Sequence, residues 1–215
     1  LTNNPKKIKE NLKNNIKVIN LNFKTAVPKK VKFYSAHFKL DVFKYLSKKN
    51  GYNCLLDLDI IAINRPPIIF KKNVKKKINM LYNLNQNYDD LNNDRNKSII
   101  KSLKYCNKLN DNTAEWYGGE FIAGSNFFFK KIYTESNKLL NNYLKNFKIL
   151  HHQGDEMIVN SAIQKLKKNK KFKYKDISNE KIITRYWSIN TLHKQKDINF
   201  HLKNFLIHLP ADKKF

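Results

Sequence analysis

Residues 52–63 read YNCLLDLDIIAI, and this stretch decides the fold class. Apart from one Asn and two Asp, every residue in it is apolar, which is typical of a strand buried on both faces of a parallel or mixed sheet. Upstream, residues 36–46 (AHFKLDVFKYL) carry apolar side chains at helical spacing. A helix followed by a buried strand predicts an α/β fold with a mixed sheet flanked by helices.

Two carboxylates interrupt this apolar stretch, at Asp57 and Asp59. Burying two like charges so close together is costly unless a cation neutralises them. Ligands of open α/β sheets bind at the carboxyl ends of strands, and Mn²⁺ and Mg²⁺ prefer oxygen ligands. The pattern therefore indicates a divalent-metal site, with a solvated strand end or a turn cap as the alternative.

Composition predicts one folded domain spanning residues 1–215. The chain is 41% hydrophobic and 13% aromatic, enough for one sizeable core. Residues 83–97 are rich in Asn and Asp with little periodicity and are predicted to form a long mobile loop. No apolar run reaches the roughly 18 residues that a membrane helix needs. Because the chain begins at Leu1 without an initiator Met, we expect it to be a fragment.

The net charge of +26 admits two interpretations. Of 43 basic residues only three are Arg, which favours a lysine-rich composition bias over selection for bases and phosphates. Under that bias, the lysines of 71–77 and 165–175 should scatter over several faces, whereas one continuous basic groove with aromatics would favour nucleic-acid binding. The two cysteines fit no disulfide framework, Cys54 is expected to be buried, and a reducing, cytoplasmic compartment fits best.

Four blocks of sequence carry a resemblance to a known family, and the first of them overlaps the stretch quoted above. Residues 38–61 combine the helix with the D-x-D strand, 121–128 read FIAGSNFF, 155–160 read DEMIVN, and 207–210 read IHLP ahead of Lys213. In this order they resemble the GT-A-fold glycosyltransferases, most closely family 8. The resemblance implies a GT-A-like (Rossmann-like) sheet whose first nucleotide-binding strand would precede Leu1. Three positions depart from the family: Ile122 replaces Asn, Glu156 replaces Gln and Met157 replaces Asp.

The resemblance also implies roles for individual residues. The metal, Mn²⁺ or Mg²⁺, would be held by Asp57, Asp59 and His208. The donor would contact Lys39, Asp57, Gly124 and Lys213. The sugar or acceptor pocket would be shaped by Gly118, Gly119, Glu120 and Trp116. The catalytic candidates are Glu156 and Asp155.

Each of these roles has a plainer alternative. His208 could be a core histidine, and Lys39 and Lys213 could be surface lysines. Gly118 and Gly119 could form an ordinary turn, and Asp155 could simply cap the helix predicted over 155–168. Glu156 suits either an inverting enzyme, as general base, or a retaining one, as a polar group beside the anomeric carbon.

Together with the D-x-D pattern, this resemblance implies a metal-dependent enzyme that moves a hexose from a UDP-sugar to a hydroxyl of a glycan or lipid-linked saccharide. A basic surface could also hold it peripherally at an anionic membrane. One alternative is a basic nucleic-acid-binding protein, although no recognition motif is present and no specific nucleic acid is expected. A second alternative is a nucleotidyltransferase on a related fold.

Overall fold

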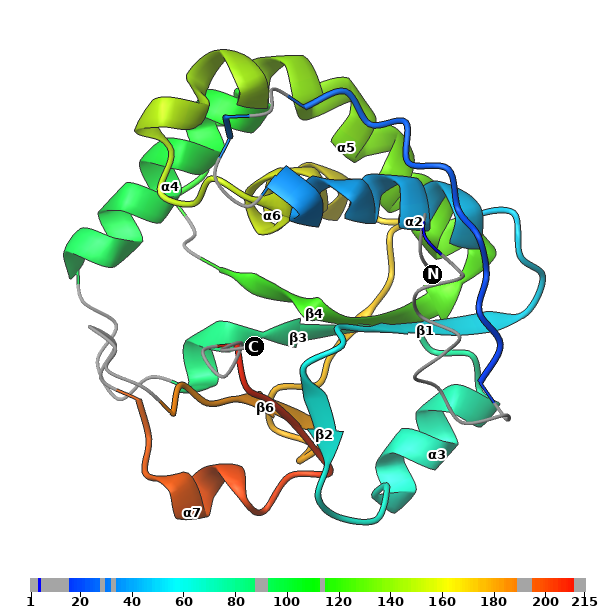
Figure 1. The fold of residues 1–215 in the computed structure, drawn as a ribbon. Helices are drawn as coiled ribbons and strands as arrows, with labels where there is room; N and C mark the ends of the chain where they lie inside the picture. Colours follow the sequence, from blue (N-terminus) through cyan, green and yellow to red (C-terminus); the bar gives the residue numbers. More distant parts are fainter. Residues whose placement is uncertain are drawn as a thin grey trace.

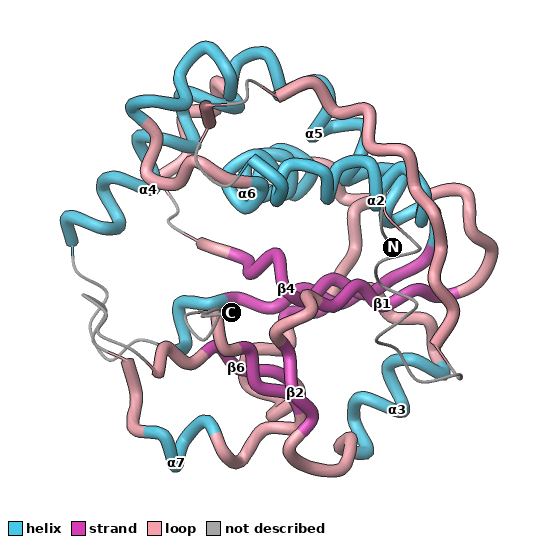
Figure 2. Tube along the Cα trace, in the orientation of Figure 1, coloured by secondary structure: helices cyan, strands magenta, loops and turns pink. Residues whose placement is uncertain are grey.

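The computed structural model describes residues 4, 16–27, 30–31, 34–87, 93–112, 115–188 and 195–210. Within them the chain forms an α/β fold of three layers, which confirms the predicted class (Figure 1). A four-stranded sheet lies in the middle, with a layer of helices on one side and a three-stranded sheet on the other (Figure 2). Both sheets are mixed, because each contains a parallel and an antiparallel pair.

The larger sheet has the order β1-β4-β3-β5. These strands span Tyr52–Leu56, Tyr117–Ser125, Met80–Asn83 and Lys175–Asp176. Strand β4 is antiparallel to both of its neighbours and is buried over all but its last residue. It carries the sequence YGGEFIAGS, so the glycines and the acidic residue at its start are held in the centre of the molecule.

The smaller sheet has the order β2-β7-β6. Its strands span Ile60–Ala62, Leu206–His208 and Ile183–Arg185, and the last two are buried throughout. Strand β2 follows β1 after a three-residue break, so the chain passes from one sheet to the other at residues 57–59.

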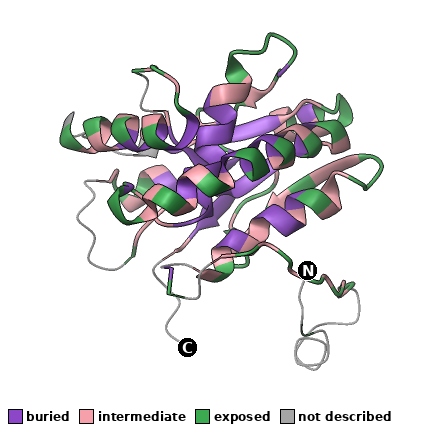
Figure 3. Cartoon of the chain, turned by 90° about the horizontal axis from the view of Figure 1, so that it is seen from above, coloured by how far each residue is buried: buried purple, intermediate pink, exposed green. Residues whose placement is uncertain are grey.

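Helices cover the outer face of the larger sheet. This layer holds α2 (Lys39–Leu46), α4 (Asn93–Asn107), α5 (Asn126–Asn146) and α6 (Asp155–Lys167), with short 3₁₀ turns at Tyr34–Phe38 and Phe147–Ile149. A third 3₁₀ turn, Leu84–Asn87, follows β3 and contacts β6 of the smaller sheet. Beside the smaller sheet lie α3 (Ile68–Lys75) and α7 (Ile198–His201). Buried residues gather in the strands and on the inner faces of these helices (Figure 3).

None of the helices in the described ranges is both long and apolar enough to cross a bilayer.

Two predictions from the sequence are wrong in detail. Residues 52–63 are not one strand buried on both faces but two strands in different sheets, and β1 lies at a sheet edge where Cys54 is exposed. Residues 83–97 are not one loop: Asn83 ends β3, a 3₁₀ turn follows to Asn87, and α4 begins at Asn93, while 88–92 lie outside the described residues. Helix α4 begins with Asn- and Asp-rich sequence, so the sequence pattern did not indicate a helix there. Its apolar face, formed by Ile99, Leu103 and Cys106, is buried.

Candidate metal centre

Asp57, Asp59 and His208 come together where the two sheets meet. One ligand atom from each residue lies within 4.8 Å of those of the other two. The turn at 57–59 places the two carboxylates, while the intervening Leu58 is fully exposed. Strand β7 supplies His208 opposite Ile60, so the pairing of β2 with β7 fixes the approach of the imidazole to the turn.

The His208 ring is held between two carboxylates. Its Nε2 lies 3.1 Å from Asp59 Oδ1 and its Nδ1 lies 3.4 Å from Glu120 Oε1. Burial lowers the pKa of His208, but the nearby carboxylates of Asp59 and Glu120 outweigh that effect and raise the pKa to about 9. A carboxylate on the second ring nitrogen is the usual support of a metal-ligating histidine, because it fixes the tautomer and the ring orientation.

Lys39, at the start of α2, borders the same cluster. Its Nζ lies 3.0 Å from Asp57 Oδ1 and 2.9 Å from Asp155 Oδ2, and it donates a hydrogen bond of 3.0 Å to the Gly119 carbonyl. Burial lowers the pKa of Lys39, yet the two carboxylates raise it well above its ordinary value. Lys39 is therefore a permanent cation, and the interpretation of it as an ordinary surface lysine is wrong.

Behind this cluster lies a buried ion network centred on Arg185 of β6. Its Nε and Nη2 donate to the two oxygens of Glu120 at 2.9 and 2.5 Å, and Nη2 also donates to Glu156. Glu156 additionally accepts hydrogen bonds from Trp116 Nε1 at 2.9 Å and from the Gly119 amide at 3.2 Å. Burial raises the pKa of Glu156, but the Arg185 charge outweighs it and lowers the pKa to about 2.

The two glycines of β4 serve close packing and not a turn. A Cβ at Gly118 would lie 2.1 Å from Glu120 Oε2, and one at Gly119 would lie 3.0 Å from Asp155 Oδ2 and 3.1 Å from Lys39 Nζ. Both residues lie inside a regular strand, and neither has a positive φ. Their missing side chains make the room in which the charged groups meet.

Asp155 is the first residue of α6, whose N-cap is Gly154. Its carboxylate faces Lys39. The interpretation of Asp155 as the helix cap is therefore wrong, and its charge belongs to the cluster.

Of the predicted donor contacts, Gly124 does not join this group. Gly124 lies at the far end of β4, opposite Asn53, where an added Cβ would meet Phe128 and Asn79. Lys213 lies outside the described residues.

Charge is unevenly balanced in the cluster. Five carboxylates, those of Asp57, Asp59, Glu120, Asp155 and Glu156, face three cations, which are Lys39, Arg185 and His208, whose raised pKa keeps its ring protonated near neutral pH. Burial and the neighbouring carboxylates of Asp155 and Glu120 raise the pKa of Asp57, although Lys39 pulls it down. A divalent cation would relieve this excess of negative charge, and two carboxylates with an imidazole are a donor set that suits Mn²⁺.

Arg185 is the residue of this site that the sequence analysis missed. A usable signal was present, because Arg185 is one of only three arginines among 43 basic residues and follows the apolar pair Ile182 and Ile183. An arginine retained in a lysine-rich chain at the end of an apolar run points to a bidentate partner.

No protein-family model matches the chain, and no curated protein matches it.

Proposed function

We propose that the chain is a metal-dependent glycosyltransferase that moves a hexose from a UDP-sugar to a hydroxyl of a glycan or lipid-linked saccharide. One observation carries the proposal: Asp57, Asp59 and His208, about 150 residues apart in sequence, bring their ligand atoms within 4.8 Å of one another. The resemblance of the sequence to GT-A-fold enzymes of family 8 supplies the substrate class.

Asp57, Asp59 and His208 would hold Mn²⁺ or Mg²⁺. The metal would act as a Lewis acid that stabilises the negative charge on the departing diphosphate. Glu120 orients the ring of His208 by contacting its Nδ1. Lys39 adds a compact positive charge beside Asp57, where it can reach a donor phosphate or a sugar hydroxyl.

Glu156 has a supporting part in this proposal. A carboxyl whose pKa is about 2 is too weak a base to accept the acceptor's proton efficiently near neutral pH. Glu156 instead accepts hydrogen bonds from Trp116, Gly119 and Arg185 and holds these three groups in place. These contacts favour a mechanism in which Glu156 shapes the sugar pocket and does not act as general base.

Calorimetric titration with Mn²⁺, and then with UDP in the presence of Mn²⁺, tests the proposal. Asp59→Asn keeps the size of the side chain but removes a charged ligand, so we expect Mn²⁺ affinity to fall at least tenfold. Asp94→Asn is the matched control, because the Asp94 side chain is 86% exposed and belongs to α4, outside the cluster. Mn²⁺ affinity in this control should not change.

Product analysis separates the proposal from its enzymatic alternative. A glycosyltransferase incubated with UDP-hexose, Mn²⁺ and an acceptor releases UDP, whereas a nucleotidyltransferase incubated with a nucleoside triphosphate and a sugar phosphate releases pyrophosphate. Equal Mn²⁺ binding by wild type and Asp59→Asn, together with no UDP release from a panel of UDP-sugars, would contradict the proposal.

A further inference from the structure

A groove rich in lysine lies at the opposite end of the larger sheet from the metal cluster. It consists of two adjoining hollows of about 270 and 70 Å³ that share Asn79 and Lys173. Its basic residues, together the lysine groove, are Lys76, Lys77, Lys131, Lys171 and Lys173. Two lysines of the run at 71–77 and two of the run at 165–175 therefore meet here, while others of the second run, such as Lys165 and Lys168, form ion pairs elsewhere.

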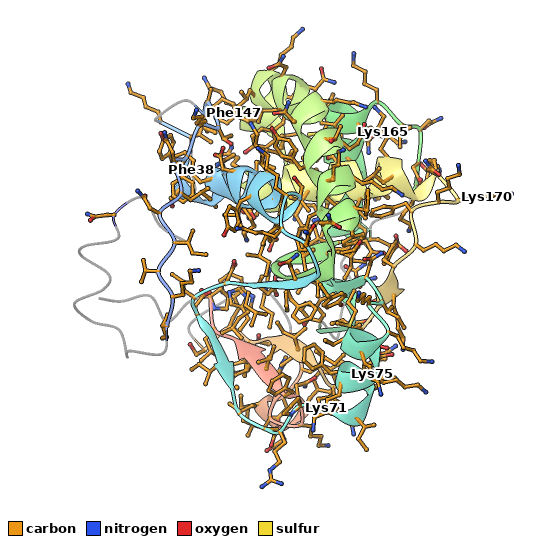
Figure 4. The ribbon with its side chains drawn as sticks, turned by 90° about the vertical axis from the view of Figure 1, so that its right-hand side faces the viewer. Phe38, Lys71, Lys75, Phe147, Lys165 and Lys170 are labelled. Carbon is orange, nitrogen blue, oxygen red and sulfur yellow. The ribbon has the colours of Figure 1, made fainter. Side chains whose placement is uncertain are left out.

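Hydrogen bonds tie the three chain segments of the groove together. Asn79 donates from Nδ2 to the Lys173 carbonyl at 2.8 Å and accepts at Oδ1 from the Ser125 amide at 3.1 Å. Lys131 donates from Nζ to the Lys171 carbonyl at 3.0 Å. The lysines thus project from a fixed floor. Figure 4 views this side, where Lys75 at the end of α3 and Lys170 before Lys171 both project on the right of the view.

The charge of the groove is not balanced by acidic residues. Other lysines nearby pair with carboxylates: Lys165 with Glu135, Lys168 with Asp111 and Lys175 with Glu180. In contrast, no carboxylate of the described ranges forms an ion pair with a lysine of the groove. Four of the five, Lys76, Lys77, Lys171 and Lys173, are exposed.

We propose that the lysine groove docks the protein on an anionic phospholipid surface. Every cation in it is a lysine, a point charge that suits many loosely ordered phosphates and not bidentate recognition of one partner. At its rim Phe127 is 69% exposed at the start of α5, and an exposed aromatic ring beside lysines suits the boundary between headgroups and acyl chains.

The aromatic residues of the groove favour lipid over single-stranded nucleic acid. A nucleic-acid groove offers successive exposed ring faces on which bases stack. Here Phe128 and Phe172 are buried and stack on each other with ring centroids 5.1 Å apart, and the Tyr174 hydroxyl bonds that of Tyr117. Phe127 is the only large apolar side chain among the described groove residues that is exposed.

Sedimentation with phospholipid vesicles tests this proposal independently of sugar transfer. The test variant replaces Lys76, Lys77, Lys171 and Lys173 by Gln. The control variant replaces four other exposed lysines by Gln: Lys101, Lys108, Lys145 and Lys148. Both variants lose the same charge, and each contains one lysine with positive φ, Lys77 at 53° and Lys108 at 58°.

We expect wild type to bind vesicles of phosphatidylcholine with 30 mol% phosphatidylglycerol, and not vesicles of phosphatidylcholine alone, at about 0.15 M salt. The groove variant should lose at least tenfold in binding and the control less than threefold. Phe127→Ser changes no charge and should weaken binding severalfold, which tests the proposal even where the four-lysine variant folds poorly.

Three results would overturn the proposal. An equal loss in both lysine variants would show that total charge and not the groove attracts the vesicles. Equal binding to neutral vesicles would exclude the charge argument. Tight binding of single-stranded DNA that depends on the groove lysines, with no vesicle binding, would make nucleic acid the occupant.

Discussion

Arg185 lies between two buried carboxylates, Glu120 and Glu156. Glu120 is completely inaccessible to solvent and Glu156 is 9% exposed, so neither charge can be hydrated if the guanidinium is removed. Breaking a buried ion pair by deleting one partner is strongly destabilising, because the remaining charge has no compensation.

We therefore expect Arg185→Met to lower the free energy of unfolding by about 3–5 kcal/mol, measured by urea denaturation at pH 7. Arg185→Lys should also be destabilising, because one ammonium cannot replace the fork that contacts both glutamates. Arg65→Met is the control, since Arg65 is exposed, and its effect should stay within about 0.5 kcal/mol. A similar small loss for Arg185→Met would contradict the dependence of the network on Arg185.

Among the secondary-structure elements, β4 carries the residues that shape the charge cluster near its start, at Gly118 and Glu120, and not in its middle. Alternate residues of a strand face the same side, so Glu120 stands on the face of Gly118 and folds back over it. An added Cβ at Gly118 would lie 2.1 Å from the Glu120 carboxylate, the group that Arg185 holds.

Gly118→Ala should cost about 1–3 kcal/mol of stability, because the carboxylate must leave its place in the network. The measurement is a double-mutant cycle with Glu120→Ala, by urea denaturation of the two single variants and the double variant. We expect the double variant to lose clearly less than the two single losses added together, since the clash disappears with the carboxylate. Additive losses would place the cost of Gly118→Ala elsewhere.

The helices and strands also show how much of the fold can be predicted from the sequence. The pattern over 155–168 predicted α6, which spans Asp155–Lys167, because its apolar spacing is regular and local. The pattern over 52–63 predicted one strand, since apolar residues on both sides of Asp57 and Asp59 do not reveal that the chain changes sheets between them. Edge position and sheet membership depend on distant partners: β1 pairs with β4, and β2 pairs with β7.

The candidate site was predictable to a similar extent. The predicted meeting of Asp57 and Asp59 with His208 matches the geometry. The position of the two carboxylates at a strand end indicated a metal site, and the resemblance to family 8 supplied His208. The ion network around Arg185 was not predicted, since its three members are separated in sequence and no local periodicity connects them.

For the whole molecule, the net charge of +26 makes self-repulsion a large unfavourable contribution to folding. Salt screens charges at the surface more than charges inside, with a Debye length of about 8 Å at 0.15 M. The buried contacts of Arg185 and Lys39 should therefore persist while the repulsion between surface lysines weakens.

We expect the melting temperature to rise by several degrees between about 10 mM and 0.2 M NaCl, measured by differential scanning calorimetry. The four-lysine groove variant should show a smaller rise, because part of the repulsion is already removed. A melting temperature that falls with salt would mean that surface ion pairs, and not repulsion, dominate the electrostatics of this protein.

The turn at residues 57–59 has a mechanical consequence. It joins β1 of one sheet directly to β2 of the other, and the contacts of Asp59 with His208 and of Glu120 with Arg185 cross the same boundary. Separating the two sheets would remove His208 from Asp59 and Arg185 from Glu120, so charged groups of both sheets would lose these partners together. We therefore expect the two sheets to open together as a single cooperative unit, together with the starts of α2 and α6, which supply Lys39, Asp155 and Glu156 to the same cluster.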